Sequence, residues 1–510
     1  MLANILSSAL IGIDAHAVEV EIDIANGLPA FTTVGLPETA VRESRERVKS
    51  AIVNSGYLFP DDRITVNLAP ADIKKEGTGF DLPIALGILL ATRVLPPGVL
   101  DDVLVAGELS LDGRVKAVHG TLPMVLMAGR RGVGTVVVPH ANRREAAVVD
   151  GVRVLAAETL SQVVAHFQGN AQMAPLQPAA ADGAVPPHDP DLDYAEVSGQ
   201  QQAKRALEIA AAGSHNLLMV GPPGSGKTML AQRMPTILPP ISFEESLETT
   251  KIYSVVGMLA PDQSLVTRRP FRAPHHTISD AGLIGGGRIP RPGEVSLAHN
   301  GVLFLDELPE FKKHVLEVLR QPLEDAKVTI SRAAMAVTYP ARFMLLAAMN
   351  PCPCGYRSDK RHECRCTPQQ VQNYLSRISG PLLDRIDLHV DVPAVAWRDL
   401  SAGQRSESSS DIAARVLAAR RVQARRFAGA GTTCNARMGT RQIRRFCATD
   451  GDGARLLENA VDKLGFSARA YGRILKISRT IADLEGSASI ASSHIAEAIQ
   501  YRSLDRSRLP

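Results

Sequence analysis

The stretch that decides the fold is Gly221-Pro-Pro-Gly-Ser-Gly-Lys227-Thr228, which has the spacing of a phosphate-binding loop. The apolar run 216–220 before it predicts a buried strand, and residues 229–233 after it predict the first turns of a helix. In that context glycine-rich backbone N–H groups bind phosphate oxygens, Lys227 reaches the terminal phosphates and Thr228 ligates magnesium. The sequence therefore predicts a nucleoside-triphosphate site built from Gly221, Pro222, Pro223, Gly224, Ser225, Gly226, Lys227 and Thr228.

Two further strand ends supply the polar groups that such a site needs. The apolar run 301–305 ends in Asp306 and Glu307, whose side chains point in different directions because they are adjacent on a strand. Asp306 suits magnesium, held through water, and Glu307 suits polarisation of the attacking water. A second apolar run, 342–349, ends in Asn350, which we expect where a residue sensing the γ-phosphate would lie.

Composition bounds the class of protein. The 510 residues are enough for about three domains, each with its own core. Aromatic residues make up only 4%, which argues against base-stacking platforms as the main mode of single-strand binding. No secretory signal is visible and no run of eighteen apolar residues exists, so we expect a cytoplasmic protein without a membrane span.

The chain order suggests four parts. Residues 1–168 alternate strand and helix patterns and predict a mixed α/β domain, and residues 169–190, rich in Ala and Pro, predict a linker. Residues 191–400 hold the nucleotide motifs, and residues 401–510 open with a serine-rich break and continue as helical patterns. Within the core, residues 327–331 and 336–340 predict a hairpin around Arg332.

Charge is unevenly distributed along the chain. Residues 401–510 contain 19 Lys and Arg against 10 Asp and Glu, a net charge of +9, which leaves −5 for residues 1–400. This excess predicts a polyanionic partner such as nucleic acid. Internal salt bridges and solvated helix faces are the alternative explanation for the arginines.

Cysteine and histidine clusters suggest metal chemistry. Four of the six cysteines, Cys352, Cys354, Cys364 and Cys366, lie within fifteen residues and predict a thiolate site for Zn²⁺. Their CxC spacing differs from the usual CxxC, so His362 could be a ligand in place of one cysteine. A redox-responsive loop, or a loop that binds no metal, is the alternative. For His275 and His276 we favour loop-stabilising hydrogen bonds over metal binding.

The first domain resembles a known family. Residues 68–72 and 75–83 and the segment 107–113 are similar to the Lon-protease-like (ribosomal S5-like) domain that begins ComM/YifB-type proteins. Lon-type proteases use a serine activated by a lysine. Here the corresponding turn contains Thr78, and residues 119–124 contain no lysine. We therefore expect no peptidase activity and interpret Thr78 as a turn residue.

The remaining chain resembles the AAA+ ATPases of the magnesium-chelatase and MCM-helicase branch, and most closely the ComM/YifB family. The similarity rests on residues 269–276, on residues 292–309 and on the order of the motifs. It implies a Rossmann-like P-loop core with a C-terminal helical lid, and ATP and Mg²⁺ as cofactors. It also implies that Arg385 is an arginine finger and Arg469 a second sensor; an intramolecular salt bridge is the alternative for either.

The resemblance implies a function as well. We expect a homohexameric ATPase that acts as a DNA motor, or helicase, in branch migration during homologous recombination and natural transformation, with Arg332 contacting DNA. A magnesium-chelatase-type motor subunit that remodels a protein partner is the alternative. An ATP-dependent protease is disfavoured because the Ser/Lys pair is missing.

Overall fold

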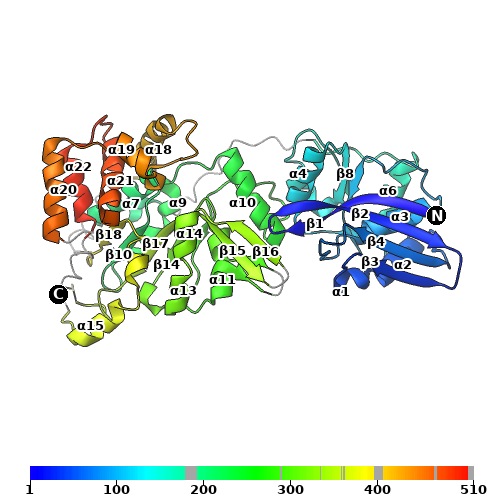
Figure 1. Cartoon of the computed structure of the whole chain (residues 1–510), viewed down its shortest axis with the longest axis horizontal. Coiled ribbons are helices and arrows are strands. Elements are labelled where there is room, and N and C mark those ends of the chain that lie inside the picture. Colours follow the sequence, from blue (N-terminus) through cyan, green and yellow to red (C-terminus); the bar gives the residue numbers. More distant parts are fainter. Residues whose placement is uncertain are drawn as a thin grey trace. The chain divides into compact units, whose positions relative to one another are not determined.

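The computed structural model describes residues 1–177, 192–287, 290–332, 335–357, 359, 362–395, 406–464 and 468–502. The chain divides into two compact units (Figure 1). The first comprises Met1–Ala184 and Phe243–Thr267, and the second comprises Val185–Ser242 and Arg268–Pro510. Each unit buries a hydrophobic core of its own.

The first unit is built on a seven-stranded mixed sheet. Its order is β3 (Ala30–Val34), β4 (Arg63–Ala69), β2 (Asp14–Ala25), β1 (Leu2–Ile11), β5 (Val103–Val105), β8 (Thr135–Pro139) and β9 (Arg153–Ala157). In β2 the side chains of Val18, Val20 and Ile22 are buried whereas Glu19 and Asp23 are exposed. This alternation buries one face of the strand and fixes its register.

Helices cover both faces of this sheet. Inward residues of α2 (Ser44–Asn54), α3 (Asp81–Ala91) and α6 (Leu160–Phe167) share one core with Val105 and Val137, whereas α4 (Thr121–Arg131) packs with Leu104 and Val136. Because neighbouring strand residues point to opposite faces, these are the two sides of one sheet. Short elements complete the unit: α1 (Thr39–Arg42), β6 (Glu108–Leu109), β7 (Val115–Lys116), η1 (His140–Asn142) and α5 (Arg143–Ala146).

Two segments of the first unit lie outside the expected boundary at residue 168. Residues up to 177 pack onto this unit: Met173 is buried in its core and Leu176 N–H donates to the Val154 carbonyl. Helix α10 (Phe243–Val256) joins it from the middle of the expected core, where Ser254 Oγ donates to Glu145 (2.6 Å). The first unit is thus assembled from two separate stretches of sequence.

The second unit is built on a five-stranded, all-parallel sheet. Its order is β11 (Phe271–Arg272), β14 (Val302–Leu305), β17 (Met344–Met349), β10 (Leu217–Val220) and β18 (Leu388–Asp391). The central strands are fully buried, as expected for apolar runs covered on both faces. This confirms the expected Rossmann-like sheet, in which the ends of β10, β14 and β17 lie at one edge.

Helices and a hairpin surround this sheet. Helix α7 (Gln201–Gly213) contributes most of its residues to the core, and α8 (Lys227–Gln232) and α9 (Met234–Ile237) follow the first motif. The predicted hairpin is present as β15 (Lys327–Arg332) and β16 (Met335–Pro340). The other elements are η2 (Tyr194–Glu196), α11 (Asp280–Ile284), β12 (Gly285–Gly286), β13 (Arg291–Pro292), α12 (Glu294–Leu297), η3 (Leu308–Glu310), α13 (Lys313–Glu317), α14 (Arg320–Asp325), α15 (Pro368–Leu375) and α16 (Gly380–Leu383).

The C-terminal part of the second unit is helical, as expected for a lid (Figure 1). It contains α18 (Ser409–Arg426), η4 (Asn435–Arg437), α19 (Thr440–Phe446), α20 (Gly451–Leu464), α21 (Ala468–Leu484) and α22 (Ser492–Gln500). Helices α18 and α21 pack on α7. Among the helices that the structure describes, none combines the length and apolar character needed to span a bilayer.

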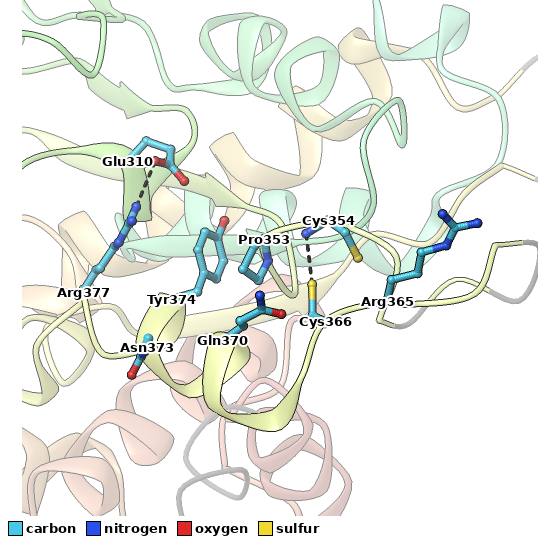
Figure 2. Close-up of a pocket in the computed structure, with 9 residues that line it drawn as sticks. All are labelled: Glu310, Pro353, Cys354, Arg365, Cys366, Gln370, Asn373, Tyr374 and Arg377. Carbon is cyan, nitrogen blue, oxygen red and sulfur yellow. Dashed lines mark hydrogen bonds and ion pairs between the residues drawn. The ribbon is translucent and has the colours of Figure 1, made fainter.

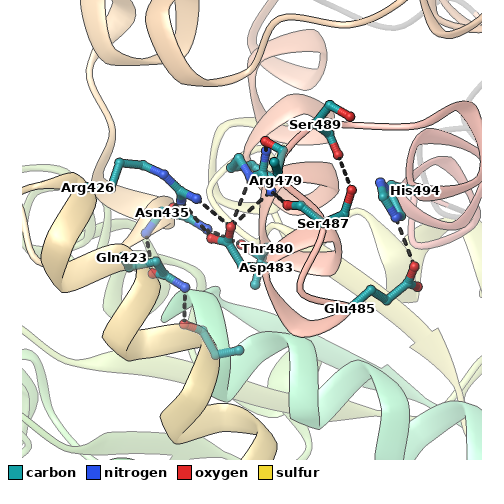
Figure 3. A network of polar contacts seen from close by, with 12 residues as sticks. Gln423, Arg426, Asn435, Arg479, Thr480, Asp483, Glu485, Ser487, Ser489 and His494 are labelled. Atoms are coloured by element: carbon teal, nitrogen blue, oxygen red, sulfur yellow. Dashed lines mark hydrogen bonds and ion pairs between the residues drawn. The ribbon is translucent and has the colours of Figure 1, made fainter.

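A buried polar network holds the lid helices together (Figure 3). The carboxylate of Asp483 accepts hydrogen bonds from both Arg426 (2.5 and 2.7 Å) and Arg479 (3.1 Å), and from the Asn435 amide (2.8 Å). Gln423 donates to the Ala212 carbonyl of α7 (3.0 Å). Several lid arginines are therefore internal, in line with the salt-bridge explanation for part of the basic excess.

Candidate functional site

The phosphate-binding loop lies between β10 and α8, as the sequence predicts. Gly226 adopts a left-handed backbone conformation (φ 90°) just before the helix begins. A Cβ atom on Gly221 would lie 2.1 Å from the Val392 carbonyl oxygen, so no larger residue fits there. These two glycines let the backbone curve tightly and present α8 with its N-terminus at the loop.

Lys227 is the buried cation of this loop. Its ammonium donates to the carbonyls of Gly221 (2.8 Å) and Pro222 (2.9 Å) and to the side-chain oxygen of Asn350 (3.3 Å). Burial lowers the pKa of Lys227. Since β17 lies between β14 and β10, Asn350 emerges beside the loop. The structure thus brings together Lys227 and Asn350, two residues that the sequence assigned to the same site.

The acidic pair lies at the end of β14, on the other side of β17. Thr228 Oγ1 donates to Asp306 Oδ2 (2.6 Å), so the two groups expected at magnesium are in direct contact. Glu307 has a left-handed backbone (φ 52°), and its backbone N–H donates to Asp306 Oδ1 (2.9 Å). A hydroxyl and a carboxylate oxygen are donors that Mg²⁺ prefers, and the more exposed Glu307 is available to water.

Glu307 has a partner that the sequence did not reveal. His276 Nδ1 lies 3.3 Å from Glu307 Oε2, and the ring packs edge-on against Phe311. Its neighbour His275 bonds to Thr277 (3.0 Å), the local role expected for this pair. Only the strand pairing could have indicated this contact. Strand β11 ends four residues before His276 and pairs in parallel with β14, so the residues that follow the two strands lie at the same edge of the sheet.

Two arginines in the segment 269–276 are structural. Arg269 donates to the carbonyls of Pro239 (2.6 Å) and Asn300 (2.6 Å), and Arg272 forms a two-point ion pair with Glu294 (2.6 and 2.7 Å). Such bidentate contacts fix the loop that carries His276. The arginines that define this motif in the sequence therefore position the loop rather than the nucleotide.

The expected finger and second sensor lie in different environments. Arg385 is buried, forms an ion pair with Glu324 and donates to the Pro381 carbonyl (2.6 Å). Arg469 is exposed at the start of α21. Four residues later, Arg473 is half-buried and its Nε lies 3.3 Å from Asp387. Within one chain neither Arg385 nor Arg469 reaches the residues around Lys227, so their roles stay predictions.

The four cysteines converge, as the sequence predicts. Their sulfur atoms all lie within 4.8 Å of one another. His362 is not part of this group; its Nδ1 contacts Asp359 (2.8 Å) instead. A backbone hydrogen bond from Tyr356 lowers the pKa of Cys354 to about 6.

A cleft of about 540 Å³ opens beside the cysteines (Figure 2). Its lining includes Cys354 and Cys366 on one side and an ion pair between Arg377 and Glu310 (2.9 Å) on the other. The cysteine loop therefore has one wall that is open to solvent.

The expected DNA contact is exposed. Arg332 ends β15 at the turn of the hairpin, whereas Val328 and Ile330 of the same strand are buried.

In the first unit, the hydroxyl of Thr78 donates to Glu108, and the buried ammonium of Lys75 donates to the Pro70 carbonyl. Thr78 is thus paired with a carboxylate rather than with a lysine.

Comparisons with known proteins agree with this architecture. The family model for magnesium chelatase, subunit ChlI, matches residues 193–400, a second model for that subunit matches residues 20–142, and one for its C-terminal part matches residues 406–502. The uncharacterized protein YifB of Salmonella typhimurium is 46% identical over 99% of this chain and 98% of its own length. Competence protein ComM of Haemophilus influenzae has the same identity and coverage.

A more distant match covers less of the chain. The magnesium-chelatase 38 kDa subunit of Rhodobacter capsulatus is 26% identical over 35% of this chain and 55% of its own length. Near-complete coverage at 46% identity, together with a parallel sheet that carries the P-loop and acidic motifs, establishes the family. The chain belongs to the ComM/YifB family of magnesium-chelatase-like AAA+ ATPases.

Proposed function

We propose that this protein is a cytoplasmic, ring-forming motor that hydrolyses ATP to move on branched DNA and promote branch migration during homologous recombination. The observation that carries the proposal is that one unit combines the P-loop, the acidic pair and Asn350 with exposed arginines on a hairpin and on lid helices. The name of the relative ComM, a competence protein, supports a role in uptake of transforming DNA.

The residues present fit a magnesium nucleotide. The loop residues 221–228 and the N-terminus of α8 suit phosphate oxygens, and Thr228 and Asp306 suit the cation. When bound, magnesium ATP supplies the phosphoanhydride bond that is cleaved. Lys227 neutralises charge on the terminal phosphates, Asn350 orients Lys227 through their 3.3 Å contact, and Glu307 polarises the attacking water.

A ring supplies the missing cation. Within one chain, Arg385 is paired with Glu324 and lies apart from the loop residues. In a homohexamer, each subunit would present Arg385 to the nucleotide of its neighbour, where the spread negative charge of the transition state is greatest. Arg469 would act as the second sensor from the lid. Hydrolysis at one subunit would then depend on the next.

DNA contact is assigned to the arginines that remain exposed. Arg332 occupies the hairpin turn, and a set on α18 and α19 is also exposed: Arg421, Arg425, Arg441, Arg444 and Arg445. Others, including Arg426 and Arg479, are used internally. Only the exposed group can neutralise phosphates and release counterions.

The second candidate is a motor subunit that remodels a protein partner. The observation favouring it is that the matching family models describe a magnesium-chelatase subunit over three parts of the chain. Such a motor needs ATP hydrolysis but no nucleic acid.

The deciding experiment measures ATP hydrolysis with and without a synthetic Holliday junction, together with displacement of the junction arms. A DNA motor is expected to show DNA-stimulated hydrolysis and ATP-dependent arm displacement, both weakening as salt rises. Lys227→Ala serves as the inactive control. Binding and stimulation that are absent at low salt would contradict the DNA assignment and favour the protein-remodelling motor.

A further inference from the structure

The four cysteines of the loop 352–366 form a cage of the size of one metal ion. Cys352 Sγ lies 3.4 Å from Cys354 Sγ and 3.7 Å from Cys364 Sγ, and Cys354 Sγ lies 3.6 Å from Cys364 Sγ. Four sulfurs at about 2.3 Å from a tetrahedral zinc ion stand about 3.8 Å apart. The spacing of these three sulfurs matches a single tetrahedral ion, and Cys366 Sγ lies within 4.8 Å of each of them.

The other states of four cysteines fit less well. A disulfide requires sulfurs about 2.05 Å apart, and all four cysteines are free thiols. The backbone N–H of Cys354 points to Cys366 Sγ (3.4 Å), a hydrogen bond of the kind that supports metal-bound thiolates (Figure 2). Arg357 and Arg365 lie within the same loop and would offset the net negative charge of a zinc tetrathiolate.

We propose that Cys352, Cys354, Cys364 and Cys366 bind one zinc ion, and that the resulting zinc knuckle holds the phosphate-binding loop and Asn350 in their working positions. The first step, zinc binding, is argued from the cysteine geometry alone. The second step, positioning of the phosphate-binding loop and Asn350, rests on the proposed nucleotide site.

The first half of the knuckle contacts the nucleotide loop directly. Cys352 follows Asn350 by only two residues, so fixing its sulfur restrains the amide that contacts Lys227. Gly355 packs so closely on Pro223 that a Cβ atom there would lie 2.5 Å from the proline ring. The same position would lie 3.8 Å from the side chain of Asn350. The loop is thus in van der Waals contact with both groups.

The second half of the knuckle leads into α15. Thr367, next to Cys366, caps this helix by accepting from the Gln370 N–H (3.3 Å), and the Gln370 side chain accepts from the Thr367 N–H (2.9 Å). Burial raises the pKa of Tyr374 on α15 to about 12, opposed by a hydrogen bond from the Asn350 backbone. Both ends of the fifteen-residue loop are therefore attached to the site around Asn350.

A bound zinc ion would stabilise the folded conformation of the loop 352–366. Ordering a loop of this length costs conformational entropy, and metal binding contributes its free energy to the folded arrangement. Loss of zinc is then expected to loosen Pro223 and Asn350 and to weaken nucleotide binding.

The first test measures metal content. The purified full-length protein is expected to contain about one zinc per chain, released by a mercurial reagent and detected with a colorimetric chelator. Cys364→Ser and Cys366→Ser should each lower the content to roughly a tenth. Cys434→Ser and Cys447→Ser, which alter buried cysteines outside the loop, are the matched controls and should keep zinc. Four reactive thiols without zinc, iron in place of zinc, or zinc retained by the loop variants would overturn the metal site.

The second test compares zinc-loaded wild-type protein with protein from which the mercurial has removed zinc. Affinity for a fluorescent ATP analogue should fall about 10-fold, and hydrogen exchange of residues 221–228 should accelerate. Both should return after thiol reduction and addition of zinc. Unchanged affinity and exchange would overturn the second step. Failure of the DNA motor alone would appear as normal zinc and nucleotide binding without junction displacement, so the two proposals fail separately.

Discussion

At the scale of single residues, the site is organised around Glu307. Its backbone is left-handed, and one of its carboxylate oxygens contacts His276. A non-glycine residue in this conformation costs about 1 kcal/mol or more, which surrounding contacts must offset. In the proposed mechanism, this turn places Glu307 for the attacking water while Asp306 serves magnesium.

Replacing Glu307 by Gln should stop turnover without preventing binding. The amide keeps the size of the side chain but cannot accept a proton from water, so kcat should fall at least about 100-fold. Phosphate release and titration with an ATP analogue measure the two effects. Glu310→Gln, in the same short turn, is the control. Hydrolysis that persists in Glu307→Gln would exclude the water-activating role.

Replacing His276 by Ala should lower kcat roughly 10-fold while leaving KM for ATP nearly unchanged, because the Glu307 carboxylate loses its orienting partner whereas the residues around Lys227 are untouched. His276→Asn, which keeps a hydrogen-bond donor, should recover part of the rate. His275→Ala removes the neighbouring ring, which bonds to Thr277 and contacts the His276 ring (centroids 4.1 Å apart) but makes no described contact with Glu307, and should have a smaller effect. Equal losses in the two alanine variants would point to general damage to the loop.

At the scale of elements, the hairpin combines a fixed base with an exposed turn. Val337 and Tyr339 of β16 are buried, and the Tyr339 hydroxyl donates to the Pro290 carbonyl (2.6 Å). Arg332 lies at the opposite end, exposed to solvent. Such a shape suits a loop that contacts a moving strand while its base stays attached to the core.

Replacing Arg332 by Ala should reduce DNA-stimulated hydrolysis several-fold and leave basal hydrolysis within about twofold, because one phosphate contact is lost while the nucleotide site is untouched. The steepness of the salt dependence should also decrease by about one unit. Lys327→Ala, an exposed cation at the base of the same strand, is the matched control. Equal losses of basal and stimulated activity would remove the hairpin from the DNA path.

A half-buried ion pair between Asp387 of the core and Arg473 of the lid helix α21 links these two parts. Although burial opposes it, the contacts with His215 and Arg473 lower the pKa of Asp387 below its usual range. A carboxylate with a lowered folded pKa contributes stability above its unfolded pKa of about 4 and loses that contribution as pH falls through the folded value. Acid therefore weakens this ion pair only well below neutral pH.

Replacing Asp387 by Asn should lower the free energy of unfolding of the second unit by roughly 2 kcal/mol, because the half-buried Arg473 loses its counter-charge. Chemical denaturation at neutral pH measures the loss. The difference between wild type and variant should shrink in strong acid. Asp462→Asn, on the exposed side of α20, is the control. A difference that is independent of pH would refute the ion-pair explanation.

At the scale of the whole molecule, one chain does not complete the proposed active site. Arg385 is paired with Glu324 in the isolated chain, and a finger role requires that this arginine act on a neighbouring subunit. A finger role and a purely structural ion pair predict different effects of replacing Arg385 and Glu324.

Arg385→Ala should abolish hydrolysis, whereas Glu324→Gln, which leaves the cation in place, should retain most of it. If the pair were only structural, both variants would fail alike. Mixing Arg385→Ala with Glu307→Gln protein should restore activity at interfaces that combine an intact site with an intact finger. Hydrolysis independent of protein concentration and of Arg385 would contradict the ring.

Most of the core could be predicted from sequence because its signals are local. The P-loop and the acidic strand end each lie within a contiguous run whose polarity pattern reports strand, turn and helix. The predicted parallel α/β core and helical lid were confirmed. The domain boundary was harder to predict: α10 packs on the first unit through Leu247 and Ser254, although it follows the P-loop in the chain. No local pattern reports which of two cores an amphipathic helix will cover.

The sequence by itself determined the chemical inventory of this protein: a nucleotide loop, two carboxylates, a sensing amide and four clustered thiols. Only the tertiary structure decided which groups meet, including His276 with Glu307 and Gly355 with Pro223. It also paired Arg385 with Glu324. The physical reason is the separation along the chain over which each effect acts. Propensity and periodicity act between near neighbours, whereas these contacts depend on strand order and on packing between segments far apart in the chain.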